Sequence, residues 1–153
     1  MSIRTRLSDD VKTAMKAKDE RLVSTLRLIL AALKDRDIAA RPKGNTTGIL
    51  EDEIMQMMNG MIKQRRDSIT LYEQGNRPEL AAKEQGEIDV IQSYLPQQMS
   101  ADEMTAAIKA VIAEIGAGSV KDMGKVMGVL KERFTGRMDF ASVSGIVKQL
   151  LAA

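Results

Sequence analysis

The 153-residue sequence predicts an all-α fold, and three observations lead to this prediction. Apolar residues recur every three or four positions along most of the chain, which is the period of an amphipathic helix. Aromatic residues make up 3% of the chain and hydrophobic residues 44%, so the core must be aliphatic and rich in methionine, as suits helices better than sheets. Caps, glycines and prolines divide the periodic stretches into seven helical segments.

The first two helices are bounded by clear signals. Apolar residues repeat from Ile3 to about Lys16, which predicts the first helix. Asp19 has the short acceptor side chain that caps a helix, and the second helix should run from there to about Ala39. The segment 41–48 is rich in Pro, Gly, Asn and Thr and is predicted to be a loop.

The third helix is expected to be long, from about Thr47 to Glu73, with Gly75 as its C-cap. The fourth should begin at an Asn76 cap and end before Pro96, because proline disfavours helical geometry in the residue that precedes it.

Two groups on the third helix each allow two interpretations. Glu51, Asp52 and Glu53 lie in its first turn, where they would stabilise the helix dipole; a hard metal cation is the alternative. The dipole interpretation is favoured, and no metal or cofactor is predicted. The three methionines within 57–61 either fill the core or form an adaptable groove for a partner helix, and core filling is favoured.

The stretch 96–99, Pro-Gln-Gln-Met, is predicted to separate two domains, residues 1–98 and 99–153. Immediately after it, Ser100 and Glu103 have the spacing of a capping box and predict a new helix start.

Three short helices are expected in the second domain. The first covers about 101–115, the second runs from a Ser119 cap to Phe134, and the third follows an Asp139 cap. The fold class is therefore a four-helix N-terminal part with long helices plus a small three-helix C-terminal bundle.

Charge is spread unevenly although the net charge is only +2. Residues 1–48 hold 11 Lys or Arg against 6 Asp or Glu, whereas residues 49–99 hold 5 against 9. The basic end predicts either an anionic partner or docking on an acidic helix of the same chain.

The residues that carry most enzyme chemistry are missing. The chain has no histidine and no cysteine, which removes the commonest general base, thiol chemistry and the usual transition-metal ligands. No nucleotide-binding glycine loop is present, and Ser142 and Ser144 have no nearby base. Glu84 and Glu87 are paired on the fourth helix but are expected to be solvated, without the burial that would shift a pKa.

No apolar run is long enough to span a bilayer. A cytoplasmic protein without a membrane partner is therefore expected.

Cations in the C-terminal domain are the candidate binding residues. Gly124 and Gly128 form a smooth strip among them, which would serve either close packing of the last helix or the approach of a ligand. The candidate RNA-binding residues are Lys121, Lys125, Lys131, Arg133, Arg137 and Lys148.

Several motifs resemble those of the GatB/YqeY family, and the resemblance covers essentially the whole chain. In the C-terminal part they are the stretches 94–100 (YLPQQMS), 124–127 (GKVM), 136–139 (GRMD) and 143–151. In the N-terminal part they are 29–34 (ILAALK), 63–68 (KQRRDS) and Tyr72 before 75–77 (GNR). The family's turn often continues Ala-Asp-Gly where this chain has Met-Asp-Phe at 138–140, and the added bulk would alter what docks there.

The resemblance implies an all-helical, two-part protein. Its C-terminal part is similar to the tail domain of the B subunit of the tRNA-dependent amidotransferase, which amidates Glu-tRNA(Gln) or Asp-tRNA(Asn). That tail helps to hold the tRNA, and the catalytic centre lies in another domain. The resemblance also brings the label of a carbon–nitrogen ligase with glutamine as amide donor, which no residue of this chain supports.

The leading hypothesis is a tRNA- or RNA-associated accessory protein without intrinsic catalysis. Its low aromatic content fits recognition of folded RNA by shape and backbone rather than by base stacking. The alternatives are a helical adaptor with a protein partner and, last, an amidotransferase-related component.

Overall fold

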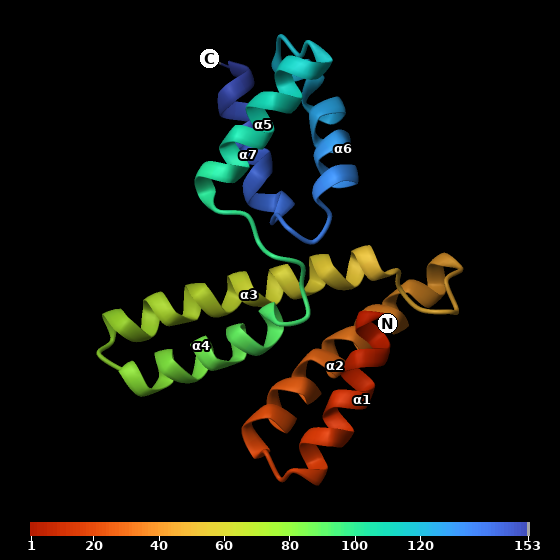
Figure 1. Cartoon of the computed structure of the whole chain (residues 1–153), viewed down its shortest axis with the longest axis vertical. Coiled ribbons are helices and arrows are strands. Elements are labelled where there is room, and N and C mark those ends of the chain that lie inside the picture. The colour runs from red at the N-terminus through yellow and green to blue at the C-terminus, as the bar shows by residue number, and fades with distance from the viewer. Residues whose placement is uncertain (153) are drawn as a thin grey trace. The chain divides into compact units, whose positions relative to one another are not determined.

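The computed structural model describes residues 1–152, and within them every regular element is helical (Figure 1). The all-α prediction is confirmed. The chain divides into two compact units, the first covering Met1–Leu95 and the second beginning at Pro96. The elements are α1 (Ile3–Lys16), α2 (Glu20–Ala40), the 3₁₀ helix η1 (Arg41–Lys43), α3 (Glu51–Gln74), α4 (Pro78–Gln92), α5 (Ala101–Ile115), the 3₁₀ helix η2 (Val120–Asp122), α6 (Met123–Phe134) and α7 (Phe140–Ala152).

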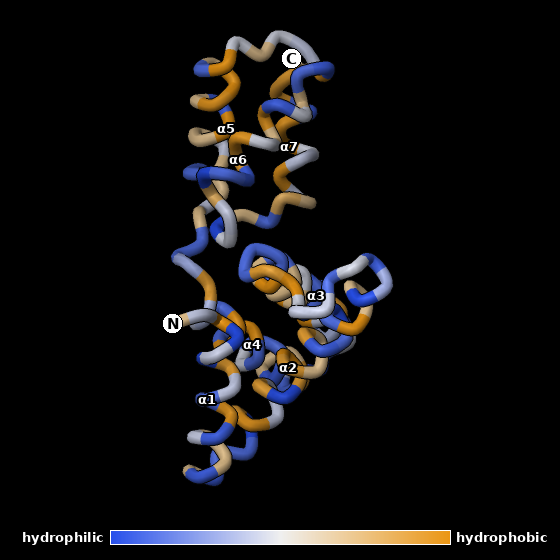
Figure 2. The backbone as a smooth tube through the Cα atoms, turned by 90° about the vertical axis from the view of Figure 1, so that its right-hand side faces the viewer, coloured by the Kyte–Doolittle hydropathy of each residue, from blue (hydrophilic) through white to orange (hydrophobic). Residues whose placement is uncertain are grey.

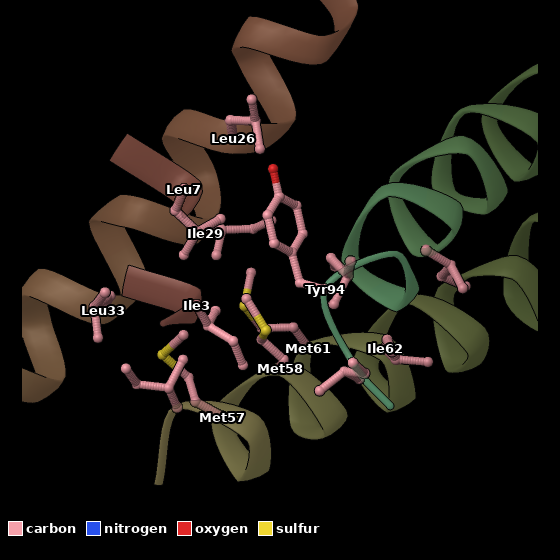
Figure 3. Packing of buried hydrophobic residues seen from close by; sticks show 14 of the residues in the cluster. Ile3, Leu7, Leu26, Ile29, Leu33, Met57, Met58, Met61, Ile62 and Tyr94 are labelled. Atoms are coloured by element: carbon pink, nitrogen blue, oxygen red, sulfur yellow. The ribbon is translucent and has the colours of Figure 1, made fainter. Parts of the chain in front are cut away.

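The first unit consists of two helical hairpins, α1–α2 and α3–α4, that share one core. Figure 3 shows the side chains of α3 pointing toward leucine and isoleucine residues of α1 and α2. Met57, Met58 and Met61 are all buried in this core. The core interpretation of the methionine cluster therefore holds, and these side chains form no open groove.

A polar clasp joins the start of α1 to the end of α2 and to the segment before α3. Arg4 donates hydrogen bonds to both carboxylate oxygens of Asp37, at 2.7 and 3.1 Å, and to the carbonyl of Ile49 at 3.1 Å. The backbone N–H of Ile49 donates to Asp37 Oδ1 at 2.9 Å. Gly48 lies beside the clasp at φ +105°, and an added Cβ there would come within 2.8 Å of Arg4 Nη2.

A second set of contacts joins α1 to the end of α4. The buried Tyr94 hydroxyl donates to Asp10 Oδ2 at 2.5 Å, and the Arg6 guanidinium lies 4.8 Å from the Tyr94 ring centroid. Burial and the Asp10 carboxylate both raise the pKa of Tyr94. These contacts attach the two hairpins to each other at their shared end.

The second unit is a three-helix bundle with its own core. Figure 2 shows polar and apolar residues alternating along α5, α6 and α7, as expected of an amphipathic bundle. Ser100 caps α5 by accepting from the N–H of Glu103, and Gly116 ends the helix at φ +67°. The buried residues are Ile108, Val111, Val126, Leu130, Met138, Phe140, Val143, Val147 and Leu151.

Three predicted helix starts are wrong. The third helix begins at Glu51 rather than near Thr47, because the Asn45 side chain accepts from Gly48 N–H while the clasp holds Ile49 in a loop. Asn76 does not cap α4; it adopts φ +56° after Gly75, and Arg77 is the N-cap. Asparagine tolerates this left-handed geometry better than other non-glycine residues.

In the second unit α6 begins at Met123 with Asp122 as N-cap, and Ser119 precedes only the 3₁₀ helix η2 and makes no side-chain cap bond. The Asp122 side chain accepts from Gly118 N–H at 3.0 Å and closes this turn ahead of the helix.

Candidate nucleic-acid interface

Three of the candidate cations lie on one side of α6. With 100° per residue, Lys125 and Lys131 share a band roughly 120° wide with Gly124 and Gly128, and Lys121 in η2 continues it. We call these five residues the lysine band. All five are exposed, and among residues 1–152 none of the three lysines forms an ion pair.

The two glycines of the lysine band face open space. A Cβ added at Gly124 or Gly128 would meet no atom within 4 Å outside its own helix. Packing of α7 on α6 therefore does not require glycine at either position. A glycine inside a helix costs about 0.5–1 kcal/mol relative to alanine, so the lysine band carries two unfavourable residues that the core of the bundle does not explain. Gly145 in α7 is a third glycine of this kind in the bundle, outside the band.

Arg133 and Arg137 differ from the lysines because each already has a partner. The Arg133 guanidinium makes two hydrogen bonds to the Glu114 carboxylate, at 2.7 and 2.6 Å, and the pair holds the pKa of Glu114 below its usual value. Arg137 follows Gly136, whose φ is +79°, and its Nε donates to the carbonyl of Gln97 at 3.0 Å. Lys148 lies exposed on α7.

The serines of α7 have local structural roles. Ser142 and the N–H of Ala141 both bond to the Asp139 carboxylate, which caps the helix. Ser144 donates to the carbonyl of Ala141 at 2.8 Å. The Ser142 hydroxyl is therefore engaged by the carboxylate that caps its own helix, and the Ser144 hydroxyl by a backbone carbonyl.

The expectation that Glu84 and Glu87 are solvated is wrong for Glu87. Arg65 on α3 donates to Glu87 at 2.9 Å and lies 4.0 Å from Glu84, and both side chains of the closer pair are only 13% exposed. The signal in the sequence was Arg65 itself, a charged residue within the apolar stripe of α3. The pair joins α3 to α4 and engages the Glu87 carboxylate in a contact between the two helices.

The carboxylates at the start of α3 are exposed, and Glu51 accepts from the backbone N–H of Ile3 at 2.6 Å. Within residues 1–152, no three His, Cys, Asp or Glu side chains converge in a way that could hold a metal ion. Across the same part of the chain, none of the helices has the length and apolar content needed to cross a bilayer.

All four aromatic side chains are buried or half-buried. Tyr94 and Phe140 are buried in the cores of their units, and Tyr72 and Phe134 are half-buried. The described surface therefore offers no fully exposed ring on which a base could stack.

Comparison with known proteins adds a family and several relatives. Residues 4–151 match the sequence model described as "Yqey-like protein". The relatives are named "Altered inheritance of mitochondria protein 41, mitochondrial". That of Saccharomyces cerevisiae (strain YJM789) is 38% identical over 98 residues, covering 64% of this chain and 51% of the relative.

Two further yeasts have relatives of the same name. The Vanderwaltozyma polyspora protein is 38% identical over 89 residues, covering 58% of this chain and 46% of the relative. The Lachancea thermotolerans protein is 35% identical over 109 residues, covering 71% and 55%. The chain spans about half the length of the curated relatives that it matches.

The expectation of a cytoplasmic protein is wrong on this comparison, because these relatives are named as mitochondrial proteins. The expectation rested on the lack of a long apolar run. Proteins of several compartments share that feature, so it does not identify one.

Proposed function

This chain belongs to the YqeY-like protein family, and we propose that it is a non-catalytic accessory protein whose C-terminal unit binds folded RNA, with tRNA as the first candidate. The observation that carries the proposal is the lysine band on α6. Its three unpaired lysines surround two exposed helical glycines that the bundle does not need for its own packing.

A strip without side chains between lysines fits a phosphate backbone. The helix surface can approach the backbone closely at Gly124 and Gly128, while the lysines on either side neutralise phosphates and release counterions. Lysine suits this role because its ammonium binds phosphate as a point charge and needs no fixed orientation.

The remaining candidate cations would contribute less. Arg133 must give up or share its two bonds to Glu114, whereas Arg137 keeps its Nη groups while Nε stays on Gln97. Lys148 on α7 would extend the contact beyond α6. The absence of fully exposed aromatic rings among residues 1–152 supports a folded RNA rather than a single strand.

Filter binding of unfractionated tRNA over a salt series tests the proposal. The affinity of the intact chain should fall with salt, and removing one lysine–phosphate interaction should flatten the log–log slope by roughly 0.7–0.9. Lys125→Ala combined with Lys131→Ala should therefore flatten it by up to about 1.4–1.8.

The matched control is Lys109→Ala, which removes an exposed lysine from α5 outside the band. It should leave the slope and the affinity unchanged. If the control changed the slope as much as the double variant does, tRNA binding would depend on the total positive charge and not on the lysine band. No binding of the intact chain at low salt would reject the proposal.

A further inference from the structure

The first unit has an open groove at the tip of the α1–α2 hairpin, far along both helices from the clasp. It has a volume of about 640 Å³. Its lining residues are Met15, Lys18, Glu20, Val23, Ser24, Arg27 and Leu28, and we call it the tip groove.

Large apolar side chains are exposed at the tip groove. Met15 is 51% exposed and Leu28 45% exposed, and half-buried Val23 lies between them in the lining. The core of the unit takes up Leu26, Ile29 and Leu33 of the same helix, and Leu22 and Val23 pack against it. Leu28 lies outside this cluster, so Leu28 and Met15 are the large apolar side chains that the unit leaves exposed at the tip groove.

The spacing of the lining residues fits a helix as partner. On α2 they occupy positions 20, 23, 24, 27 and 28, which form one stripe over two turns, about 12 Å long. A stripe of this kind is the ridge-and-groove surface against which another helix packs. Recognition of an amphipathic helix in an apolar groove is a recurrent mode of peptide binding.

The charged residues at the tip groove indicate that the partner's charge is negative. Lys18 and Arg27 lie in the lining against one acidic residue, Glu20, and residues 1–48 as a whole hold 11 basic against 6 acidic residues. Arg27 Nη2 lies 3.9 Å from Met15 Sδ, and its side chain forms no ion pair among the described residues. The guanidinium thus has a sulfur contact but no carboxylate partner among the described residues, and its other N–H groups can meet an incoming carboxylate.

A second groove in the same unit provides a contrast. It lies beside Tyr94, and its lining includes Asp10, Asp19 and Asp89 without a basic residue. An acidic partner is repelled there and attracted at the tip groove, so charge separates the two surfaces.

We propose that the tip groove docks an acidic amphipathic helix of a partner protein, with apolar anchors against Met15, Val23 and Leu28 and carboxylates beside Lys18 and Arg27. This interaction belongs to the first unit and does not depend on RNA binding by the second.

Fluorescence anisotropy with the full chain tests the proposal. The probe is a labelled peptide of about 18 residues, long enough to form a helix, with leucines on one stripe and glutamates elsewhere. It should bind saturably. A peptide of the same composition in scrambled order, and one with lysine in place of glutamate, should each bind at least about tenfold more weakly, because one loses the stripe and the other the charge match.

Variants locate the binding site. Leu28→Asp should weaken binding at least about tenfold, since it removes the leucine side chain that the docked helix would bury. Arg27→Glu should weaken it several-fold by charge reversal. The matched controls are Leu71→Asp, an exposed leucine on α3, and Arg36→Glu, on the far side of α2; both should bind within about twofold of the intact chain.

The outcomes separate the partner classes. If circular dichroism shows that Leu28→Asp does not fold, the site is tested by comparing the peptide affinity of Arg27→Glu with that of Arg36→Glu. The proposal is overturned if the acidic peptide does not bind, or if the scrambled peptide binds equally well. It is also overturned if Leu71→Asp and Arg36→Glu weaken binding as much as Leu28→Asp and Arg27→Glu do. It is also overturned if Leu28→Asp abolishes self-association in sedimentation, or if phosphatidylserine vesicles or duplex RNA, and not the peptide, bind the groove.

Discussion

Gly124 and Gly128 lie in the interior of α6 without a packing reason for glycine, so changing them tests the helix and the proposed interface separately. Gly124→Ala and Gly128→Ala should each stabilise the second unit by about 0.5–1 kcal/mol, because a Cβ meets no atom within 4 Å and alanine loses less entropy on folding. Thermal melting followed by circular dichroism measures this gain.

Gly136→Ala is the control of opposite sign. Its φ of +79° lies where an L side chain is strained, so this substitution should lower the melting temperature. A loss of stability in the α6 variants would show that these glycines have a structural role after all. A larger residue, as in Gly128→Leu, should keep the fold and weaken tRNA binding by blocking close approach.

Asp37 makes the stability of the first unit depend on pH. The hydrogen bonds from Arg4 hold the pKa of Asp37 below its usual value of 3.8. Because the folded-state pKa is lowered, the stabilisation is present above the unfolded-state pKa of about 4 and is lost as pH falls through the folded-state pKa. Asp37→Asn should therefore be less stable than the intact chain at pH 6, with the difference shrinking below about pH 4.

Urea unfolding of both proteins between about pH 2.5 and 7 measures this dependence. Asp35→Asn, on the same helix and exposed, is the matched control and should show a small difference at every pH. A deficit of Asp37→Asn that stayed constant with pH would mean that the loss is not electrostatic.

Single residues also mark the limits of sequence reasoning at the candidate site. The helical spacing of Lys121, Lys125 and Lys131 can be followed in the sequence itself. The pairing of Arg133 with Glu114 cannot, because that contact joins positions 19 residues apart on two helices. Pairing across helices depends on their crossing geometry, which periodicity does not encode.

Whole helices were easier to predict where their signals are local. α1 and α5 have the predicted bounds, and the Asp19 and Ser100 caps form the expected hydrogen bonds. The predicted start of α3 was wrong because a contact distant in sequence decides it: Asp37 on α2 holds the N–H of Ile49. Local propensity yields to tertiary contacts of this kind.

The α3–α4 hairpin should depend on its half-buried ion pair. Arg65→Met removes a partner of Glu87 at 2.9 Å where both side chains are 13% exposed, and should destabilise the first unit by about 1–3 kcal/mol. Adding Glu87→Gln should recover part of this loss, because the uncompensated charge is then gone. Urea unfolding of both variants measures the two changes.

Arg77→Met is the matched control for this pair. Arg77 bonds Glu79 at 2.7 Å, but both side chains are more than half exposed, and such a surface pair contributes about 0–1 kcal/mol. If Arg65→Met cost no more than Arg77→Met, solvent would screen the Arg65 pair as fully as the surface one.

The two units have separate hydrophobic cores, and the segment between them makes specific bonds to the second. The carbonyl of Gln97 accepts from Arg137, the Gln98 side chain donates to Gly136, and the N–H of Met99 donates to Arg137. Met99 also packs against the core of the second unit. The capping box at Ser100 marks the start of α5, but these contacts include three earlier residues in the same folded body.

We therefore propose that the second unit folds alone only when it retains this segment. A fragment of residues 96–153 should be helical and melt cooperatively, whereas one of residues 100–153 should be less stable by about 1–3 kcal/mol, since hydrogen bonds each contribute about 0.5–1.5 kcal/mol net. So small a domain has little stability to lose, and this difference decides whether it is folded at about 37 °C. Circular dichroism melts of both fragments measure it, with Gln98→Ala in the longer one expected to fall between them. If the two fragments had equal melting temperatures, the folding unit would begin at Ser100. The contacts of residues 97–99 would then contribute nothing to its stability.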